Sequence, residues 1–352
     1  MSWKPEVDEI EARREAARAM GGPEAVRRQH ERGRLTIRER LDRLVDPESL
    51  EEQGPLAGEA ERDDEGRLLE LHPANYLLAL ARIEGRPAVV GGEDFTQRGG
   101  SPSPAGLRRS VYAESLATEL RWPLVRFLEG GGGSVASSSG RRSHTPRLEG
   151  DPVYAPSRFL SIARLLGIAP VVSAAVGAVA GFPAARLAAS HFSVMTRETA
   201  QVLIGGPALV ERALAIEQMK RFLAYLPTNR LALPPVESRP EDDPERREES
   251  LLEAIPRNRR QVYAMRKVLA AIFDEGSLFE LTRGYGRSQI TALARLAGRP
   301  VGVLANDPHF YAGSMDAEGA LKLRRFVDLC DTFHLPIVSL VDEPGFLIGS
   351  AS

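Results

Sequence analysis

The sequence predicts an α/β fold built from two homologous units in tandem, and three observations support this prediction. The segment that begins at Ala81 recurs from Ala294 without a gap, at a constant offset of 213 positions (294 − 81 = 213). Each copy places a short apolar strand after a Gly-Arg-Pro turn, and a helical stretch before a second apolar strand. Each second strand ends in an acidic residue and glycine, at 129–132 and 342–345. Strands that alternate with helices are typical of an α/β fold.

The residues before the repeat are charged and have helical spacing. The alanine-rich segment 5–32 is expected to form a surface helix. Thr36 and Glu39 stand at the spacing of a capping box, which predicts a helix that runs through Leu44. The arginines of this region indicate either a solvated face with ion pairs inside the helix or a clamp for a phosphate-like anion. They are Arg32, Arg34, Arg38, Arg40 and Arg43.

A second echo locates an insertion in the first unit. The motif Asp-x-x-Ser-Leu at Asp46 recurs at Asp274, an offset of 228, so the first unit carries about fifteen extra residues (228 − 213 = 15), expected as a loop within 54–76. The expected strands and helices of the two copies follow from the apolar pattern. They are strands at 88–91, 124–128, 301–305 and 337–341, and helices at 107–120 and 317–333.

Composition narrows the class of protein. The chain has 352 residues, enough for two domains with cores, and a formal net charge of −2, which does not indicate nucleic acid or membrane as a partner. A single cysteine excludes a disulfide framework and a thiolate zinc site. The longest apolar stretch, 168–185, is broken by glycine and proline, and is expected to be a buried strand plus a loop. The N-terminus lacks the apolar core of a signal peptide, so a cytoplasmic location is expected.

The domain organisation follows from the repeat and from one proline-rich, acidic segment. Residues 231–250 are expected to be a linker, because they have little apolar side chain to bury. We therefore expect a helical extension at 1–33, a first domain at 34–230 and the start of a second domain at 251–352. The counterpart of Gly181 would fall at 394 (181 + 213 = 394), so the second domain is expected to be truncated in this chain or partly undescribed.

Two glycine-containing loops are the candidate sites. After the apolar strand 168–176, a helix is expected to start near Pro183, which would leave the backbone N–H groups of Gly181 and Phe182 free to hold an oxyanion. The alternative is a tight turn with small residues for close packing. The four consecutive glycines 130–133 directly follow a strand, which favours close approach of a ligand over a flexible linker, and no Walker sequence is present.

Conventional catalytic groups do not assemble in the sequence. The histidines are scattered without the spacing of metal ligands, so no metal site is predicted. No Gly-x-Ser-x-Gly motif is present either. The sequence therefore favours chemistry by backbone donors on a bound cofactor or thioester.

Several motifs carry a family resemblance over nearly the whole chain. They are Gly33-Arg34-Leu35-Thr36-Ile37-Arg38-Glu39-Arg40-Leu41, Asp94-Phe95-Thr96 with Gly99-Gly100-Ser101, Ile204-Gly205-Gly206-Pro207, Asn306-Asp307-Pro308, and Val341-Asp342-Glu343-Pro344-Gly345-Phe346. The chain resembles the carboxyltransferase (β) subunits of the biotin-dependent acyl-CoA carboxylases, such as propionyl-CoA and methylcrotonyl-CoA carboxylase.

The resemblance implies tandem crotonase-like domains and transfer of CO2 from carboxybiotin to the α-carbon of an acyl-CoA. It also implies a biotin-carrying partner, the biotin carboxylase/biotin carboxyl carrier (α) subunit, and a homo-hexamer, with biotin N1 taking the α-proton. By this resemblance the site residues fall into three groups. They are Gly181 and Phe182 for the oxyanion, Gly131, Gly132, Gly133 and Ala180 for acyl-CoA, and Pro344, Gly345 and Phe346 for biotin.

Two departures from the family pattern keep other functions open. Phe182 stands where the family has glycine, and Ser134 stands where it has arginine. One alternative is a catalytically degenerate paralogue that serves as a structural or regulatory subunit of a carboxylase complex. The other is a biotin-dependent decarboxylase subunit that runs the same transfer in reverse.

Overall fold

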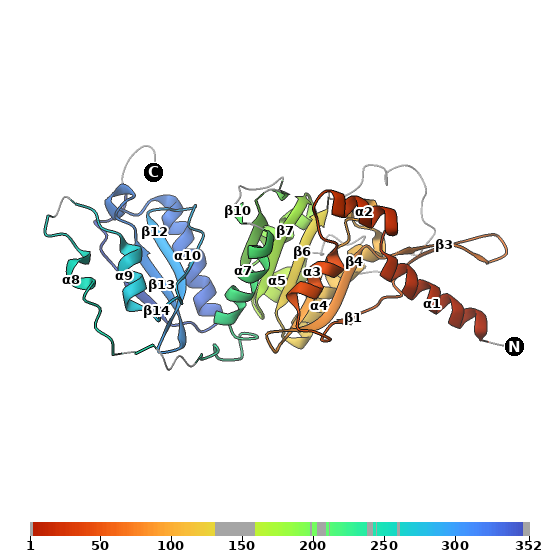
Figure 1. Ribbon diagram of the computed structural model, residues 1–352, viewed down its shortest axis with the longest axis horizontal. Coiled ribbons are helices and arrows are strands. Elements are labelled where there is room, and N and C mark those ends of the chain that lie inside the picture. Colours follow the sequence, from red (N-terminus) through yellow and green to blue (C-terminus); the bar gives the residue numbers. More distant parts are fainter. Residues whose placement is uncertain are drawn as a thin grey trace. The chain divides into compact units, whose positions relative to one another are not determined.

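The computed structural model describes residues 3–130, 159–197, 199–202, 209–210, 212–237, 242–243, 245–258 and 261–347. It divides into two compact units, Met1–Lys220 and Arg221–Ser352, and each is described by itself (Figure 1). The division falls inside helix α7 (Arg212–Tyr225), before the segment predicted as a linker. The domain limits drawn from the sequence remain predictions.

The N-terminal segment forms two helices where one was predicted. Helices α1 (Lys4–Ala19) and α2 (Pro23–Glu31) are separated by Met20 and two glycines. A Cβ on Gly21 would lie 2.2 Å from the carbonyl oxygen of Thr96, and Gly22 has a left-handed φ of 84°. The prediction of a single helix was wrong because this turn requires both glycines.

The predicted capping box is present at the start of helix α3 (Ile37–Leu44). The Glu39 N–H donates to Oγ1 of Thr36 (3.3 Å), and the Thr36 N–H donates to Oε2 of Glu39 (2.7 Å). These two bonds satisfy two backbone donors that a helix start leaves without partners.

The first unit contains an eight-stranded sheet of order β1-β4-β5-β6-β7-β8-β10, with β9 paired to β7. Strands β4 and β5 are antiparallel, and β5, β6, β7, β8 and β10 run parallel to one another. The strands are β1 (Glu51–Glu52), β4 (Tyr76–Ile83), β5 (Arg86–Glu93), β6 (Leu124–Gly130), β7 (Val171–Val179), β8 (Phe192–Thr196), β9 (Gln201–Val202) and β10 (Leu209–Val210). The short helix η1 (Arg98–Gly100) and helices α4 (Pro104–Leu120), α5 (Leu160–Leu166) and α6 (Phe182–Ala188) connect them.

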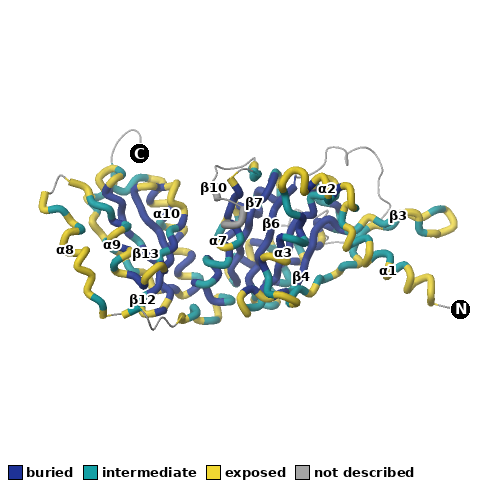
Figure 2. The backbone as a smooth tube through the Cα atoms, in the orientation of Figure 1, coloured by how far each residue is buried: buried dark blue, intermediate teal, exposed yellow. Residues whose placement is uncertain are grey.

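The core of this unit lies between the sheet and the helix pair α4 and α5, which pack on each other. Leu78, Val89 and Leu124 of the sheet meet Ala113 of α4 and Leu165 of α5, all of them buried. Figure 2 shows the central strands as buried and helix α1 as largely exposed. This burial on the strands is what the apolar runs of the sequence predicted.

The predicted insertion at 54–76 is an antiparallel hairpin. Its strands are β2 (Gly58–Arg62) and β3 (Leu68–Pro73), which pair only with each other. The fifteen extra residues therefore add a hairpin beside α1, where a loop was expected.

The second unit has a four-stranded sheet of order β11-β12-β13-β14. Strands β12 and β13 are antiparallel, and β13 and β14 are parallel. Its elements are α8 (Leu251–Ala254), α9 (Met265–Ile272), β11 (Phe279–Leu281), β12 (Gln289–Leu296), β13 (Arg299–Asn306), η4 (Tyr311–Gly313), α10 (Ala317–Thr332) and β14 (Ile337–Leu340).

The two units repeat each other in backbone detail. The bounds of β12 and β13 equal those of β4 and β5 plus 213. The residues of η1 have φ values of 52°, 60° and 70°, and those of η4 have 51°, 51° and 83°. Oγ of Ser49 accepts the N–H of Arg82 (3.1 Å), as Oγ of Ser277 accepts that of Arg295 (3.1 Å). The duplicated unit inferred from the constant offset is confirmed.

Candidate active site

The carboxyl ends of β5, β6 and β7 meet at one edge of the parallel sheet, where such folds bind ligands. Strand β7 continues to Val179, three residues beyond the predicted strand, and Val179 pairs with Gly130 at the end of β6. The Ala180 N–H donates to the Gly130 carbonyl (2.9 Å). Gly181 therefore follows directly on this junction. The predicted acyl-CoA residues Gly131, Gly132 and Gly133, and Ser134 beside them, lie outside the described residues.

Gly181 forms the turn between β7 and helix α6. Its φ of 63° and ψ of −127° belong to a conformation that only glycine adopts readily. Helix α6 starts at Phe182, with Pro183 near its beginning as predicted. The first N–H groups of a helix have no acceptor within the helix. The turn can therefore direct backbone donors to the same edge as the end of β6.

The Phe182 side chain packs within the protein. Its ring centroid lies 5.0 Å from that of Phe159, in an edge-on arrangement, and 4.1 Å from the guanidinium carbon of Arg186. The family pattern has glycine at this position, and these two contacts accommodate the phenylalanine ring. They also tie the start of α6 to its neighbours.

A buried ion network holds α6 against the sheet. Oε1 of Glu114, on α4, lies 2.7 Å from Nη1 of Arg126 and 2.8 Å from Nε of Arg186. Nη2 of Arg126 donates to the Arg186 carbonyl (3.0 Å). All three side chains are buried, and burial lowers the pKa of the Arg126 guanidinium. The sequence analysis missed this network, because its members come from three elements that only the sheet order brings together.

The carboxylate of Glu129 is held by a second buried network at the end of β6. Oε1 lies 3.2 Å from Nη1 of Arg34, and Oε2 lies 2.5 Å from Nη2 of Arg40 and 3.2 Å from Nε2 of Gln29. Arg38 instead contacts Glu52 (2.9 Å). For these three arginines the interpretation as a solvated face with ion pairs inside the helix was wrong, because their partners Glu129 and Glu52 lie outside the helix. The phosphate clamp stays a prediction.

In the second unit, the predicted biotin-binding residues form one loop after β14. The Met315 N–H donates to the Gly345 carbonyl (3.0 Å), and the Leu347 N–H donates to the Met315 carbonyl (2.8 Å). Gly345 has a φ of 131°, and, apart from its own atoms and its two chain neighbours, no described atom lies within 4 Å of the position its Cβ would take. Phe346 is 74% exposed. The loop is thus anchored at two backbone positions and open beside Gly345.

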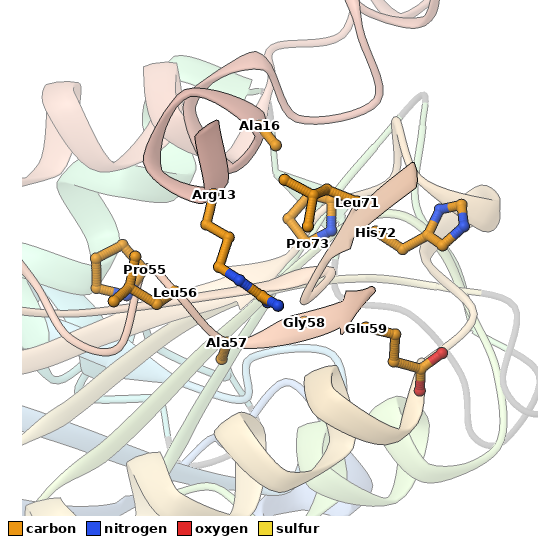
Figure 3. Close-up of a pocket in the computed structure, with 10 residues that line it drawn as sticks. All are labelled: Arg13, Ala16, Pro55, Leu56, Ala57, Gly58, Glu59, Leu71, His72 and Pro73. Carbon is orange, nitrogen blue, oxygen red and sulfur yellow. The ribbon is translucent and has the colours of Figure 1, made fainter. Parts of the chain in front are cut away.

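Other surface features lie away from these strand ends. A small pocket between α1 and the β2–β3 hairpin is lined by ten residues that include no predicted site residue (Figure 3). The hairpin also brings Glu61, Glu70 and His72 together, all exposed. Among the described helices, none combines the length and the apolar character that a membrane crossing requires.

Comparisons with known proteins agree with this architecture. The model of the carboxyl transferase domain matches residues 28–220 and 211–352. The chain is 31% identical to the propionyl-CoA carboxylase beta chain of Cereibacter sphaeroides, over 98% of this chain and 71% of the relative. It is 30% identical to the propionyl-CoA carboxylase beta chain of Roseobacter denitrificans, over 98% of this chain and 72% of the relative.

A solved structure shows the same fold. It is transcarboxylase 12S, described as a hexamer assembly with methylmalonyl-coenzyme A and methylmalonic acid bound. It superposes with a TM-score of 0.84 at 27% identity, and covers 100% of this chain and 72% of its own. The crotonase-like fold and the resemblance drawn from the sequence motifs are confirmed. The chain therefore belongs to the carboxyl transferase domain family, as a carboxyltransferase subunit of the biotin-dependent acyl-CoA carboxylase type.

Proposed function

We propose that the turn at Gly181 is the oxyanion site of this carboxyltransferase, with the backbone N–H groups of Gly181 and Phe182 as its donors. The observation that carries the proposal is the glycine-only conformation of Gly181 at the junction of β6 and β7. A strained turn persists where the surrounding structure enforces it, and the Glu114 network does so here.

Carboxyl transfer to an acyl-CoA requires such hydrogen-bond donors. When the α C–H bond of an acyl-CoA breaks, negative charge develops on the thioester oxygen, and the electron pair then forms the new C–C bond to CO2. Fixed N–H groups aimed at this oxygen stabilise the charge, and one such donor changes kcat by about 10²–10³-fold in other enzymes. Carboxybiotin, when bound, supplies the CO2 unit and an acceptor for the α-proton.

Acyl-CoA would lie along the end of β6. We assign Gly131, Gly132, Gly133 and Ala180 to it because Ala180 directly precedes Gly181, and the three glycines follow Gly130 in the chain, which pairs with Val179. The Ala180 N–H is already used by Gly130, so Ala180 contributes by shaping the path of the backbone. A single methylene changes specificity by only about 1–3 kcal/mol, so the acyl group is identified by assaying a series of acyl-CoA thioesters.

Biotin would lie against the loop of Pro344, Gly345 and Phe346. The open space beside Gly345 and the exposed ring of Phe346 suit a flat, uncharged ring system. The anchoring of the loop to Met315 keeps these groups in place. In Gly345→Val, we expect the KM for carboxybiotin to rise more than that for acyl-CoA, and unchanged kinetics for both substrates would remove this assignment.

We further propose a biotin-carrying α subunit as partner, a hexamer of this chain and a cytosolic location. Support for the first two comes from relatives that are named as subunits of carboxylases and from the solved structure described as a hexamer. The location rests on the sequence, and the single cysteine, which is free and buried, agrees with it.

The sharpest test deletes one N–H and keeps every side chain, although it also weakens the Gly181 carbonyl as the acceptor of the Ala185 N–H. Replacing Phe182 by its α-hydroxy analogue turns the amide into an ester and keeps the ring on Phe159 and Arg186. We expect kcat for carboxyl transfer to fall about 10²–10³-fold. The same replacement at Phe159 is the control and should change kcat little. Wild-type turnover with the ester at 182 would refute the Phe182 donor. The variant Gly181→Pro should also be inactive, but proline cannot adopt a φ of 63°, so it breaks the turn as well.

A further inference from the structure

Glu93 is a buried residue at the end of β5 whose side chain reaches the end of β6. It is 4% exposed. Its Oε2 accepts the N–H of Glu129 at 3.3 Å, and the backbone of Glu93 itself also donates to this carboxyl group. Glu129 directly precedes Gly130, whose carbonyl accepts the N–H of Ala180. Glu93 therefore contacts the backbone from which the glycine loop departs.

The second unit shows what this position does. Asn306 is the counterpart of Glu93 (93 + 213 = 306), and Asp342 is the counterpart of Glu129 (129 + 213 = 342). Oδ1 of Asn306 accepts the Asp342 N–H (2.8 Å), and Nδ2 donates to the Asp342 carbonyl (2.6 Å). A neutral side chain with one donor and one acceptor thus clamps the backbone just after β14 (Ile337–Leu340) in the second unit.

A carboxylic acid offers the same pair of groups as a carboxamide, whereas a carboxylate offers acceptors only. An ionised Glu93 could therefore accept the Glu129 N–H but could not donate to the Glu129 carbonyl. Only the protonated form reproduces the clamp that Asn306 makes.

The charges around Glu93 allow the neutral form. Arg126 of β6 and Arg186 of α6 lie on its side of the sheet, but both pair with Glu114 of α4, and no described hydrogen bond joins either of them to Glu93. Tyr76 of β4 stands opposite Glu93 in the β4–β5 register. The carboxylate of Glu129 is bound by arginines of its own. Burial raises the pKa of Glu93, and it outweighs the opposing effects of Arg186, of Arg126 and of the hydrogen bonds from the backbone of Glu93 and Glu129.

We propose that Glu93 is a positioning residue that works as a neutral carboxylic acid, accepting the Glu129 N–H and donating its O–H to the Glu129 carbonyl. It thereby fixes the end of β6 beside the Gly181 turn. The inference rests on the proposed function, because it assigns this backbone to the acyl-CoA site. Ionisation at high pH would remove the donor and release the strand end.

The test compares the same change, glutamate to glutamine, at two buried positions, Glu93 and Glu114. Glu93→Gln keeps the donor and the acceptor, so the complete enzyme with its partner should retain kcat/KM within about twofold, and Glu93→Ala should lower it roughly tenfold. Glu114→Gln is the matched control. The Glu114 carboxylate balances two arginines, so the neutral amide should lower kcat/KM severely. In the native enzyme, carboxyl transfer should decline at high pH, and Glu93→Gln should remove this decline.

Infrared spectroscopy of the carbonyl region gives a readout that needs no activity. The native protein should show a protonated carboxyl band at neutral pH that Glu93→Gln lacks. A missing band, or a Glu93→Gln variant as impaired as Glu93→Ala, would overturn the inference. If the native complex showed the band but transferred no carboxyl group, the proposed function would fail while the assignment of a neutral Glu93 would stand.

Discussion

Substituting Gly100 by alanine should disturb the candidate site, while the same change at the adjacent Gly99 should not. Both glycines are left-handed, with φ values of 70° and 60°. A Cβ on Gly100 would lie 2.0 Å from the carbonyl oxygen of Glu129 and 2.7 Å from Cα of Gly130, whereas a Cβ on Gly99 would have nothing within 4 Å. In the second unit, Ala312 occupies the position of Gly99 with a φ of 51°. Alanine is therefore compatible with this step of the turn.

The magnitudes follow from two terms. The left-handed conformation costs alanine about 1–2 kcal/mol at either position. Gly100→Ala adds a clash with backbone that must move by about 1 Å, and overpacking of this kind costs about 1–3 kcal/mol. We therefore expect the free energy of unfolding to fall by about 1–2 kcal/mol for Gly99→Ala and by about 2–5 kcal/mol for Gly100→Ala.

Urea denaturation followed by tryptophan fluorescence measures this difference in the first unit. Both tryptophans lie in that unit, and Trp3 is 78% exposed, so the signal reports mainly on Trp122, which packs against the buried core. Carboxyl transfer should fall with Gly100→Ala, because the end of β6 must shift. Equal destabilisation by the two variants would refute the reasoning.

Two further predictions concern the buried charges. Arg40→Gln leaves the fully buried Glu129 carboxylate with one arginine, so the free energy of unfolding should fall by about 3 kcal/mol. Lys4→Ala removes an exposed ion pair with Asp8 and should change the free energy of unfolding by less than about 1 kcal/mol. Urea denaturation of both variants measures the two values, and similar values would contradict the prediction. Burial alone would raise the pKa of Asp307, but its hydrogen bonds from Arg266 and His309 hold it below the ordinary value of 3.8. The stabilisation from ionised Asp307 is present above pH 3.8 and is lost as the pH falls through the lowered pKa. Amide hydrogen exchange in β12 and β13 should therefore quicken in acid, and Asp307→Asn should weaken this dependence on pH. The same dependence in the variant and the native protein would count against the prediction.

The repeat could be predicted from the sequence because its signals are local. Apolar runs, Gly-Arg-Pro turns and the Thr36–Glu39 capping box each act within a few residues, and one constant offset relates the two copies. The predicted strand after Ile168 and the helix start near Pro183 agree with β7 and α6 for the same reason.

The buried networks could not be predicted because their members are distant in the sequence. Gln29 and Glu129 are separated by 100 positions, and Arg186 and Glu114 by 72. Their pairing depends on the order of strands in the sheet, which no local pattern specifies. The role of Glu93 could have been suspected from the repeat alone, since its counterpart is asparagine, but the hydrogen bonds of Asn306 are needed to say what that role is.

The measurement that tests the central claim most directly is transfer of a labelled carboxyl group in the complete enzyme. The biotin-carrying partner is loaded with labelled carboxybiotin and mixed with this chain and a series of short and long acyl-CoA thioesters. We predict that the label appears on one class of acyl-CoA, and that the α-hydroxy replacement at Phe182 slows this transfer without preventing assembly with the partner. No label on any acyl-CoA, with the partner shown to carry carboxybiotin, would contradict the account and favour a structural role for the chain.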